Sequence, residues 1–318
     1  MKAGFVTGLV SLVGRPNAGK STLVNRLVGT KVAIVSDKPQ TTRTRILGVR
    51  NHPNAQIVFL DTPGIHRPLH RMNVRMVDRA IESTRDVDVV GLVIDAAEPA
   101  GNGQRFVLDL MKGVKAPVFL ILNKIDLLKR SRLLPMIDAY SRTASFAEIV
   151  PLSAATGENV DRLERALIER LPEGEPNYPP DYFTDQPERV FAAEMVREKL
   201  LQFTRAEIPF SSAVIIDRFE EPDREASSGS VGRGASHTKS ARDNQPLLKL
   251  YCTIVVERES QKPIVVGRGG EMVKRIGSAA REDLERFFEC RVFLDLQVRV
   301  KSEWRDDERV LTEIGLGK

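Results

Sequence analysis

The chain has 318 residues, 42% of them hydrophobic and 29% charged, with a net charge of +5. This balance excludes a wholly disordered or fibrous protein, and the length suggests two domains of ordinary size. The most apolar stretch, residues 87–97, is interrupted by Asp88 and Asp95, so no membrane-spanning helix is predicted. Two cysteines are too few for a disulfide framework. The mild positive charge permits a nucleic acid or an acidic membrane surface as partner but proves neither.

The first half of the chain alternates short apolar runs with amphipathic ones. Runs rich in Val, Ile and Leu predict buried strands over residues 6–12, 56–60, 87–95, 118–122 and 149–152. The segments between them predict helices over residues 20–28, 72–83, 103–113, 133–145 and 160–171. This alternation indicates an α/β domain with a doubly wound, mostly parallel sheet over residues 1–171.

A glycine-rich loop joins the first predicted strand to the first predicted helix. It reads Gly-Arg-Pro-Asn-Ala-Gly-Lys-Ser, the spacing of a phosphate-binding loop (P-loop), in the strand-to-helix context that this motif requires. Backbone N–H groups of such a loop surround phosphates, and the helix N-terminus adds partial positive charge. We expect Lys20 to reach the β- and γ-phosphates and Ser21 to ligate Mg²⁺. The predicted contacts are Gly14, Arg15, Pro16, Asn17, Ala18, Gly19, Lys20, Ser21 and Thr22.

A second motif ends the strand predicted over residues 56–60. Asp61 is placed to hold Mg²⁺ through water, and the Gly64 amide is placed to meet a γ-phosphate. Such a turn is common and weak evidence alone, but its position after an apolar strand and after the P-loop strengthens it. The residues predicted to contact nucleotide here are Asp61, Thr62, Pro63, Gly64 and Ile65.

A third motif ends the strand predicted over residues 118–122 and selects the base. The Asp126 carboxylate can accept both N1–H and the N2 amino group of guanine, a donor pair that adenine lacks. A loop after the last predicted strand would back the base with a main-chain amide. The predicted base contacts are Asn123, Lys124, Ile125 and Asp126, with Ser153, Ala154 and Ala155.

Two threonines lie in the polar segment between the P-loop and Asp61. A mobile loop at this place usually supplies a threonine to Mg²⁺ when the γ-phosphate is present, and so acts as a switch. Thr42 is the preferred ligand and Thr41 the second choice, with a plain polar loop as the alternative. The predicted metal ligands are Ser21, Thr42 and Asp61. Together these elements resemble the translation-factor-related GTPases over roughly residues 5–170, which implies GTP with Mg²⁺ and hydrolysis to GDP and phosphate.

The sequence names no group that activates the attacking water. Ras-like proteins carry a glutamine directly after the D-x-x-G glycine, but this chain has Ile65, whose alkyl side chain cannot orient water. The catalytic residue therefore stays unknown, with Asn17, Lys20 and Thr42 supporting the phosphates, and hydrolysis is expected to be slow or assisted. In a related GTPase class an asparagine at the place of Asn17 helps to hold K⁺; the alternative is that Asn17 only braces the loop.

A change of composition marks a domain boundary. Residues 172–187 are rich in proline and predict a semi-rigid linker to a second domain over residues 188–318. Residues 221–247 are rich in Ser, Gly and Arg and predict a flexible insertion. The insertion is either a solvated spacer or a contributor of phosphate contacts through Arg224, Arg233, Lys239 and Arg242. The other elements predicted are a helix from Pro187, strands over 212–219, 248–259 and 291–301, and a helix over 271–288 interrupted by Gly277.

A G-x-x-G loop in the second domain predicts RNA binding. It lies between an apolar segment and a basic helix, the arrangement with which K-homology (KH) domains clamp single-stranded RNA. The motif is weak alone, and a plain turn is the alternative, but its strand–loop–helix–strand context supports an α+β KH domain of type II. We expect Val265, Val273 and Ile276 to line a groove for the bases. The predicted RNA contacts are Gly267, Arg268, Gly269, Gly270, Lys274 and Arg275.

The whole chain resembles the Era-like GTPases, bacterial ribosome-assembly GTPases with a C-terminal KH domain. The resemblance rests on the motifs above and on segments such as Tyr-Pro-Pro-Asp-Tyr-Phe from residue 178 and Trp-Arg-Asp-Asp-Glu-Arg-Val-Leu from residue 304. It implies binding of 16S rRNA near its 3′ end, a role in small (30S) subunit assembly, and a cytoplasmic pool with a peripheral inner-membrane fraction. We expect a monomer. The insertion at 221–247 is longer than this family's usual connection.

Two other classes of protein fit the sequence less well. A GTP switch at a membrane without an RNA ligand would need an amphipathic basic helix with an aromatic face, and residues 284–288 more plausibly pack on the sheet. A GTPase coupled to RNA modification would need a cofactor domain or a reactive cysteine motif, and the sequence displays neither.

Overall fold

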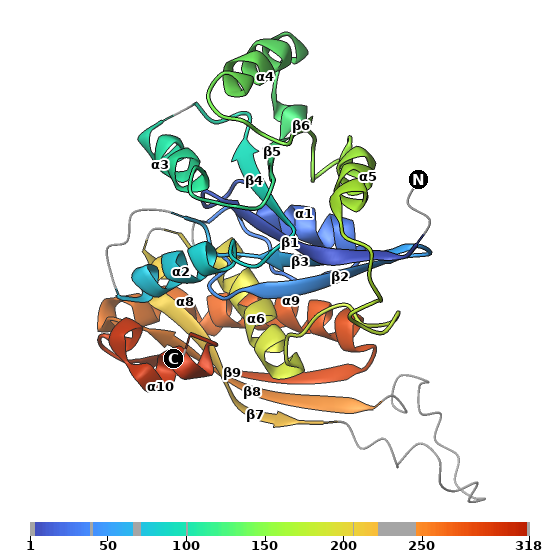
Figure 1. The fold of residues 1–318 in the computed structure, drawn as a ribbon. Coiled ribbons are helices and arrows are strands. Elements are labelled where there is room, and N and C mark those ends of the chain that lie inside the picture. The colour runs from blue at the N-terminus through green and yellow to red at the C-terminus, as the bar shows by residue number, and fades with distance from the viewer. Residues whose placement is uncertain are drawn as a thin grey trace, which may run out of the picture. The chain divides into compact units, whose positions relative to one another are not determined.

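The computed structural model describes residues 4–38, 41–65, 71–99, 101–205, 207–221 and 246–316. The chain forms two compact units, Met1–Gln186 and Pro187–Lys318 (Figure 1). The insertion predicted at 221–247 lies outside the described residues except for its ends. None of the described helices has the length and apolarity that crossing a membrane requires.

The first unit is built on a six-stranded sheet of order β2-β3-β1-β4-β5-β6. β2 runs antiparallel to β3, and all other neighbours run parallel. The strands are β1 (Val6–Gly14), β2 (Ile46–His52), β3 (Ala55–Asp61), β4 (Val89–Asp95), β5 (Val118–Asn123) and β6 (Glu148–Pro151). The strands predicted from apolar runs are confirmed within a few residues, whereas β2 is absent from the sequence prediction.

Helices cover both faces of this sheet. They are α1 (Lys20–Val28), α2 (Arg71–Glu82), α3 (Asn102–Met111), α4 (Leu133–Ser141) and α5 (Val160–Arg170), with one-turn helices η1 (Ile125–Leu127) and η2 (Arg130–Arg132). Successive strand residues enter two different cores: Ile121 packs with residues of α1 and α5, and Leu120 packs with residues of α2 and α3. Burial on both faces is why these strands read as unbroken apolar runs. Their carboxyl ends meet at one edge of the sheet, where ligands bind in folds of this kind.

The segment predicted as a linker packs on the first unit. Gln56 Oε1 accepts hydrogen bonds from the backbone N–H of Asn177 (2.7 Å) and of Tyr178 (3.0 Å). Further along, Thr184 forms a bridge with Gly48 of β2. The first unit therefore extends to Gln186 instead of ending at residue 171, and the second begins at Pro187.

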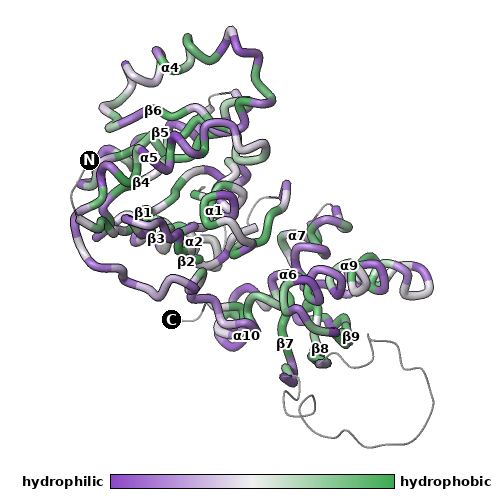
Figure 2. Tube along the Cα trace, turned by 90° about the vertical axis from the view of Figure 1, so that its right-hand side faces the viewer, coloured by the Kyte–Doolittle hydropathy of each residue, from purple (hydrophilic) through white to green (hydrophobic). Residues whose placement is uncertain are grey.

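The second unit is a three-stranded sheet with helices on one side (Figures 1 and 2). β8 lies in the middle, antiparallel to β7 and parallel to β9. α6 and α9 pack on the sheet and share one hydrophobic core with it. In chain order the elements are α6 (Glu188–Phe203), α7 (Ile208–Ser211), β7 (Ser212–Glu220), β8 (Leu247–Val256), η5 (Glu259–Gln261), α8 (Lys262–Val266), η6 (Arg268–Gly270), α9 (Glu271–Phe288), β9 (Arg291–Val300), η7 (Trp304–Asp306) and α10 (Glu308–Glu313). This order is that of a type II KH domain, as predicted.

One local prediction is wrong. Gly277 does not interrupt the helix, because α9 runs unbroken from Glu271 to Phe288. A Cβ added to Gly277 would lie 3.3 Å from Leu296 Cδ1, so the glycine allows β9 to approach the helix closely. The alternation predicted for β9 is confirmed: Leu294 and Leu296 pack against the core, and Phe293 on the opposite face is exposed.

Candidate functional site

The P-loop joins β1 to α1 and closes around the side chain of Lys20. Gly19 precedes the helix with a φ of +91°, and a Cβ there would lie 2.2 Å from Asn123 Nδ2, so only glycine fits. Lys20 Nζ donates to the backbone carbonyls of Gly14 (3.3 Å) and Arg15 (3.1 Å). Burial lowers the pKa of Lys20 to about 8, and the nearby Asp61 carboxylate opposes that shift. A bound phosphate would supply the negative charge that this buried cation lacks.

The three predicted metal ligands come together from separate elements. Ser21 Oγ of α1 donates to Asp61 Oδ2 of β3 (2.6 Å) and lies 2.8 Å from Thr42 Oγ1. Thr42 Oγ1 also donates to Asp61 Oδ2, at 3.4 Å. Thr41, the second choice, donates its hydroxyl to the Lys38 carbonyl of its own loop (2.6 Å), so the geometry favours Thr42.

This cluster has the donor chemistry of a Mg²⁺ site. Asp61 Oδ1 is buried and has no hydrogen-bond partner within the described part of the chain. Burial raises the pKa of Asp61, against the charge of Lys20 and the hydrogen bonds from Ser21 and Thr42. The described residues contain no group of three or more His, Cys, Asp and Glu suited to a metal. A metal here would therefore rest on hydroxyls, one carboxylate, water and ligand oxygens, which suits Mg²⁺.

A cavity of about 340 Å³ opens beside the cluster. The P-loop and α1 contribute one part of the lining, and residues 34–37, 41 and 42 contribute another. Sequence reasoning missed Ile34, Val35 and Ser36, because these residues carry no motif. The residues that line it are Pro16, Asn17, Gly19, Lys20, Ser21, Thr22, Ile34, Val35, Ser36, Asp37, Thr41, Thr42, Gly64 and Lys124.

Asn123 ties the predicted base-binding loops to the P-loop. Its Nδ2 donates to the Ala18 carbonyl (2.8 Å), and its Oδ1 accepts from the Ala154 N–H (2.9 Å). Asp126 lies in η1 with its side chain exposed at the same edge. Lys124 Nζ pairs with Asp95 Oδ2 at 2.6 Å. Asp95 was not predicted as a site residue, although its place at the end of a buried parallel strand was a usable signal.

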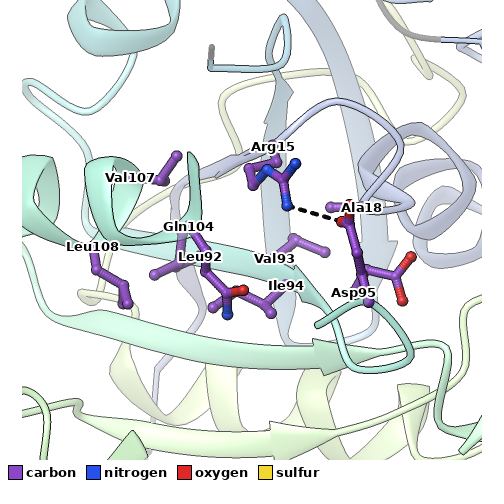
Figure 3. A pocket seen from close by; sticks show the side chains of 10 residues that line it. Arg15, Ala18, Leu92, Val93, Ile94, Asp95, Gln104, Val107 and Leu108 are labelled. Carbon is purple, nitrogen blue, oxygen red and sulfur yellow. Dashed lines mark hydrogen bonds and ion pairs between the residues drawn. The ribbon is translucent and has the colours of Figure 1, made fainter. Parts of the chain in front are cut away.

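Two P-loop side chains turn to other partners. The Arg15 guanidinium pairs with Glu98 (3.0 Å) beside a small apolar pocket (Figure 3). Asn17 takes a φ of +63°, and its Nδ2 donates to the Asp37 carbonyl at 2.6 Å. Ile65, at the place of the expected glutamine, is 1% exposed and packs in the core, so it presents no polar group to water.

The G-x-x-G loop of the second unit forms a turn in front of α9. Gly269 and Gly270 have φ values of +60° and +82°, and added Cβ atoms would meet nothing within 4 Å. The glycines are therefore required by backbone conformation and keep the surface of the turn bare. Arg268 and Lys274 are exposed beside it. Arg275 lies over the Phe203 ring, with Cζ 4.2 Å from the centroid, which fixes its guanidinium on α6.

A groove of about 440 Å³ runs between α9 and β9 next to this turn. Val273 lines it as predicted, but Val265 and Ile276 do not, since both are fully buried in the core. Their place is taken by residues of α9 and β9 that face the opening. The lining residues are Val273, Lys274, Gly277, Ser278, Arg281, Val292, Phe293, Leu294 and Leu296.

The fold and the two sites define a class: a P-loop GTPase with a C-terminal KH domain. Family models agree, one described as 50S ribosome-binding GTPase over residues 9–124 and one as KH domain over residues 248–305. The chain is 45% identical over 311 residues to GTPase Era of Geobacter metallireducens, which covers 98% of each chain. It is also 45% identical to GTPase Era of Syntrophus aciditrophicus, covering 98% of this chain and 95% of that one.

Solved structures give the same result. A crystal structure of Era in complex with MgGDPNP and nucleotides 1506–1542 of 16S ribosomal RNA matches with a TM-score of 0.89 and 39% identity, covering 99% of this chain and all of that one. A variant of Aquifex aeolicus Era bound to GDP and AlF₄⁻ matches with a TM-score of 0.88 and 39% identity over the same shares. The chain belongs to the Era family, and it is a GTPase that hydrolyses GTP to GDP and phosphate.

Proposed function

We propose that this chain binds 16S rRNA near its 3′ end and acts in assembly and maturation of the 30S subunit, under control of GTP bound with Mg²⁺. The observation that carries the proposal is the pairing of two sites in one chain. One is a hydroxyl and carboxylate cluster beside a buried lysine, and the other is a bare glycine turn beside an apolar groove. The related Era chain in the complex holds MgGDPNP and an rRNA segment, which supports this reading.

The roles proposed for the nucleotide site follow from the motifs and from the contacts described above. Lys20 and the N–H groups of the P-loop hold the phosphates. Ser21 and Thr42 ligate Mg²⁺ directly, and Asp61 holds it through water. When bound, Mg²⁺ neutralises charge on the phosphate oxygens. Asp126 accepts the two guanine donors, while Asn123 holds the Ala154 loop against the base.

Asn17 is proposed to take part in binding K⁺, which would supply positive charge where no arginine does. The hydrogen bond from its Nδ2 to the Asp37 carbonyl holds the Asn17 side chain at the cavity, where its amide oxygen can serve as a ligand. Carbonyl and amide oxygens are the ligands that K⁺ prefers. Hydrolysis should then be faster in K⁺ than in Na⁺ buffer at equal ionic strength. Asn17→Ala should bring the K⁺ rate down to the Na⁺ rate; equal rates in the wild-type protein would refute the role.

RNA binding is tested with a labelled RNA of the 16S rRNA 3′ end and a scrambled RNA of equal length. Fluorescence anisotropy should give the tighter Kd for the 16S segment. Arg268→Ala and Lys274→Ala should each weaken the binding of both RNAs. Each should also lower the slope of log K against log salt by about one. Glu271→Gln, beside the same turn, is the matched control and should not lower the slope. Equal affinity of the wild-type protein for both RNAs would contradict the assignment to 16S rRNA.

The proposed location is the cytoplasm, with a peripheral fraction at the inner membrane, and the proposed state is a monomer. The net charge of +5 supports attraction to rRNA and to anionic lipid alike. Sucrose-gradient sedimentation of cell extract should place the protein with 30S particles, and flotation should carry a minor part with membranes. Loss of the protein from the membrane fraction after RNase treatment of the extract would indicate ribosome carry-over and refute direct attachment.

A further inference from the structure

Two aromatic rings and a guanidinium lie in a row across the second sheet. Tyr251 in β8 and Phe293 in β9 have ring centroids 5.8 Å apart, and Arg218 Cζ in β7 lies 5.7 Å from the Tyr251 centroid. Their strand neighbours Leu250 and Val292 are buried against α6 and α9, so the row is on the opposite face. We name Arg218, Tyr251 and Phe293 the aromatic platform.

The aromatic platform is the open part of that face. Phe293 is 47% exposed, a large value for a phenylalanine, and the Arg218 side chain is 69% exposed. Further along β8 on the same face, Thr253 and Val255 are buried. A single exposed ring needs no explanation, but rings and a guanidinium aligned on adjacent strands form a surface on which flat groups stack.

The aromatic platform is continuous with the groove proposed to bind RNA. Phe293 belongs to β9, the edge strand, and also lines the groove between β9 and α9. A strand leaving the groove across this edge meets the Phe293 ring next and then Tyr251. We propose, on the basis of the RNA-binding function above, that the aromatic platform stacks one or two unpaired bases of the same RNA beyond the groove.

The charges around the aromatic platform favour bases over phosphates as its ligand. Glu220 pairs with both Arg218 and Lys249, the latter at 3.3 Å. Asp295 follows Phe293 on the same face of β9. Arg218 and Lys249 are thus balanced by nearby carboxylates and offer little free charge to a phosphate backbone or an anionic lipid surface. Binding at the aromatic platform should rest on stacking, which is tolerant of sequence.

The experiment compares RNAs that do and do not reach beyond the groove. KH loops clamp about four nucleotides, so a tetranucleotide should occupy only the groove, and a dodecanucleotide should cross the edge of β9. Phe293→Ala should weaken binding of the longer RNA about tenfold and binding of the tetranucleotide, which meets Phe293 only as one part of the groove wall, much less. The slope of log K against log salt should stay the same. Gln297→Ala, exposed on the same face of the same strand, is the control and should change neither Kd.

A spectroscopic readout separates stacking from a structural effect. 2-Aminopurine placed beyond the four groove nucleotides should lose fluorescence on binding to the wild-type protein and to Phe293→Tyr, but not to Phe293→Ala. The aromatic platform is refuted if the Phe293→Ala protein binds both RNAs with the wild-type Kd, or if its Kd rises by the same factor for both. In either case RNA binding itself stands. If the wild-type protein binds neither RNA, the proposed function itself fails. A fluorescence change that survives Phe293→Ala would show that the labelled base stacks elsewhere, and would refute the aromatic platform.

Discussion

The buried charge of Lys20 should make nucleotide affinity depend on pH. Its pKa lies near 8 in the free protein because burial disfavours the charged form, and a bound phosphate would hold the proton far above that value. GDP binding above pH 8 therefore requires proton uptake, and the affinity falls as pH rises. With a free pKa of 8 and a much higher bound pKa, linkage gives about a fourfold loss of affinity between about pH 7 and 8.5.

Isothermal titration calorimetry measures this effect directly. GDP is titrated at both pH values in excess EDTA, so that a metal at Asp61 contributes nothing. Near pH 8, comparison of buffers with different ionisation enthalpies should reveal uptake of about half a proton per GDP. Lys20→Arg is the control, because arginine keeps its charge throughout this range and should remove the dependence due to the side chain. Titration of guanine itself affects both proteins equally.

The lowered pKa of Lys20 should also make the stability of the fold depend on pH. Between pH 8 and 10.5 the unfolded chain keeps the Lys20 proton that the folded chain has lost. Stability of the nucleotide-free protein should therefore gain a contribution from Lys20 as pH rises across this window.

An unchanged GDP affinity at both pH values, without proton uptake, would show that Lys20 is already charged in the free protein. The inference that the P-loop desolvates it would then be wrong.

Three substitutions test the rest of the two sites. Asn123→Ala leaves the buried Ala18 carbonyl and Ala154 N–H without their partner, and each unsatisfied group costs about 1–3 kcal/mol. GDP affinity, measured by calorimetry, should therefore fall at least about tenfold. Asp126→Asn removes an acceptor of the guanine donor pair, and competition binding should lower the preference for GTP over xanthosine triphosphate by about a hundredfold. Gly269→Asp places a carboxylate on a turn that is bare in the wild type, so RNA binding should be lost while the GTPase rate stays within about twofold. Retained RNA affinity in that variant would remove the turn from the interface.

The sequence was most informative where local chemistry decides the structure. Helix α1 has the predicted bounds because glycines in left-handed conformations flank it on both sides, Gly19 and Gly29. β2 was missed because Ile46–His52 is an antiparallel edge strand whose second half, from Arg50, is polar. It is held as a strand by its pairing with β3, to which a two-residue turn at Pro53 and Asn54 joins it.

Contacts between distant residues account for the other differences. The proline-rich segment after α5 reads as a linker, yet the Gln56 side chain supplies its backbone with partners more than a hundred residues away in the chain. Motif order placed Asn123 and Asp61 in the site and preferred Thr42 to Thr41, but it contained no physical reason for that preference. That choice depends on which hydroxyl the loop turns toward Ser21. Nor could it pair Lys124 with Asp95, which adjacent strands bring together.

Both sites use a helix N-terminus preceded by a glycine, but the cations beside it are buried in one site and exposed in the other. In each, a left-handed glycine stands directly before a helix whose first turn has no side-chain cap: Gly19 before α1 and Gly270 before α9. The free N–H groups suit anionic oxygens in both places. The first site adds the buried Lys20, where salt screens little, whereas the second adds the exposed Arg268 and Lys274, where salt screens strongly. On the proposed RNA-binding function, nucleotide binding should therefore persist across ionic conditions that release RNA.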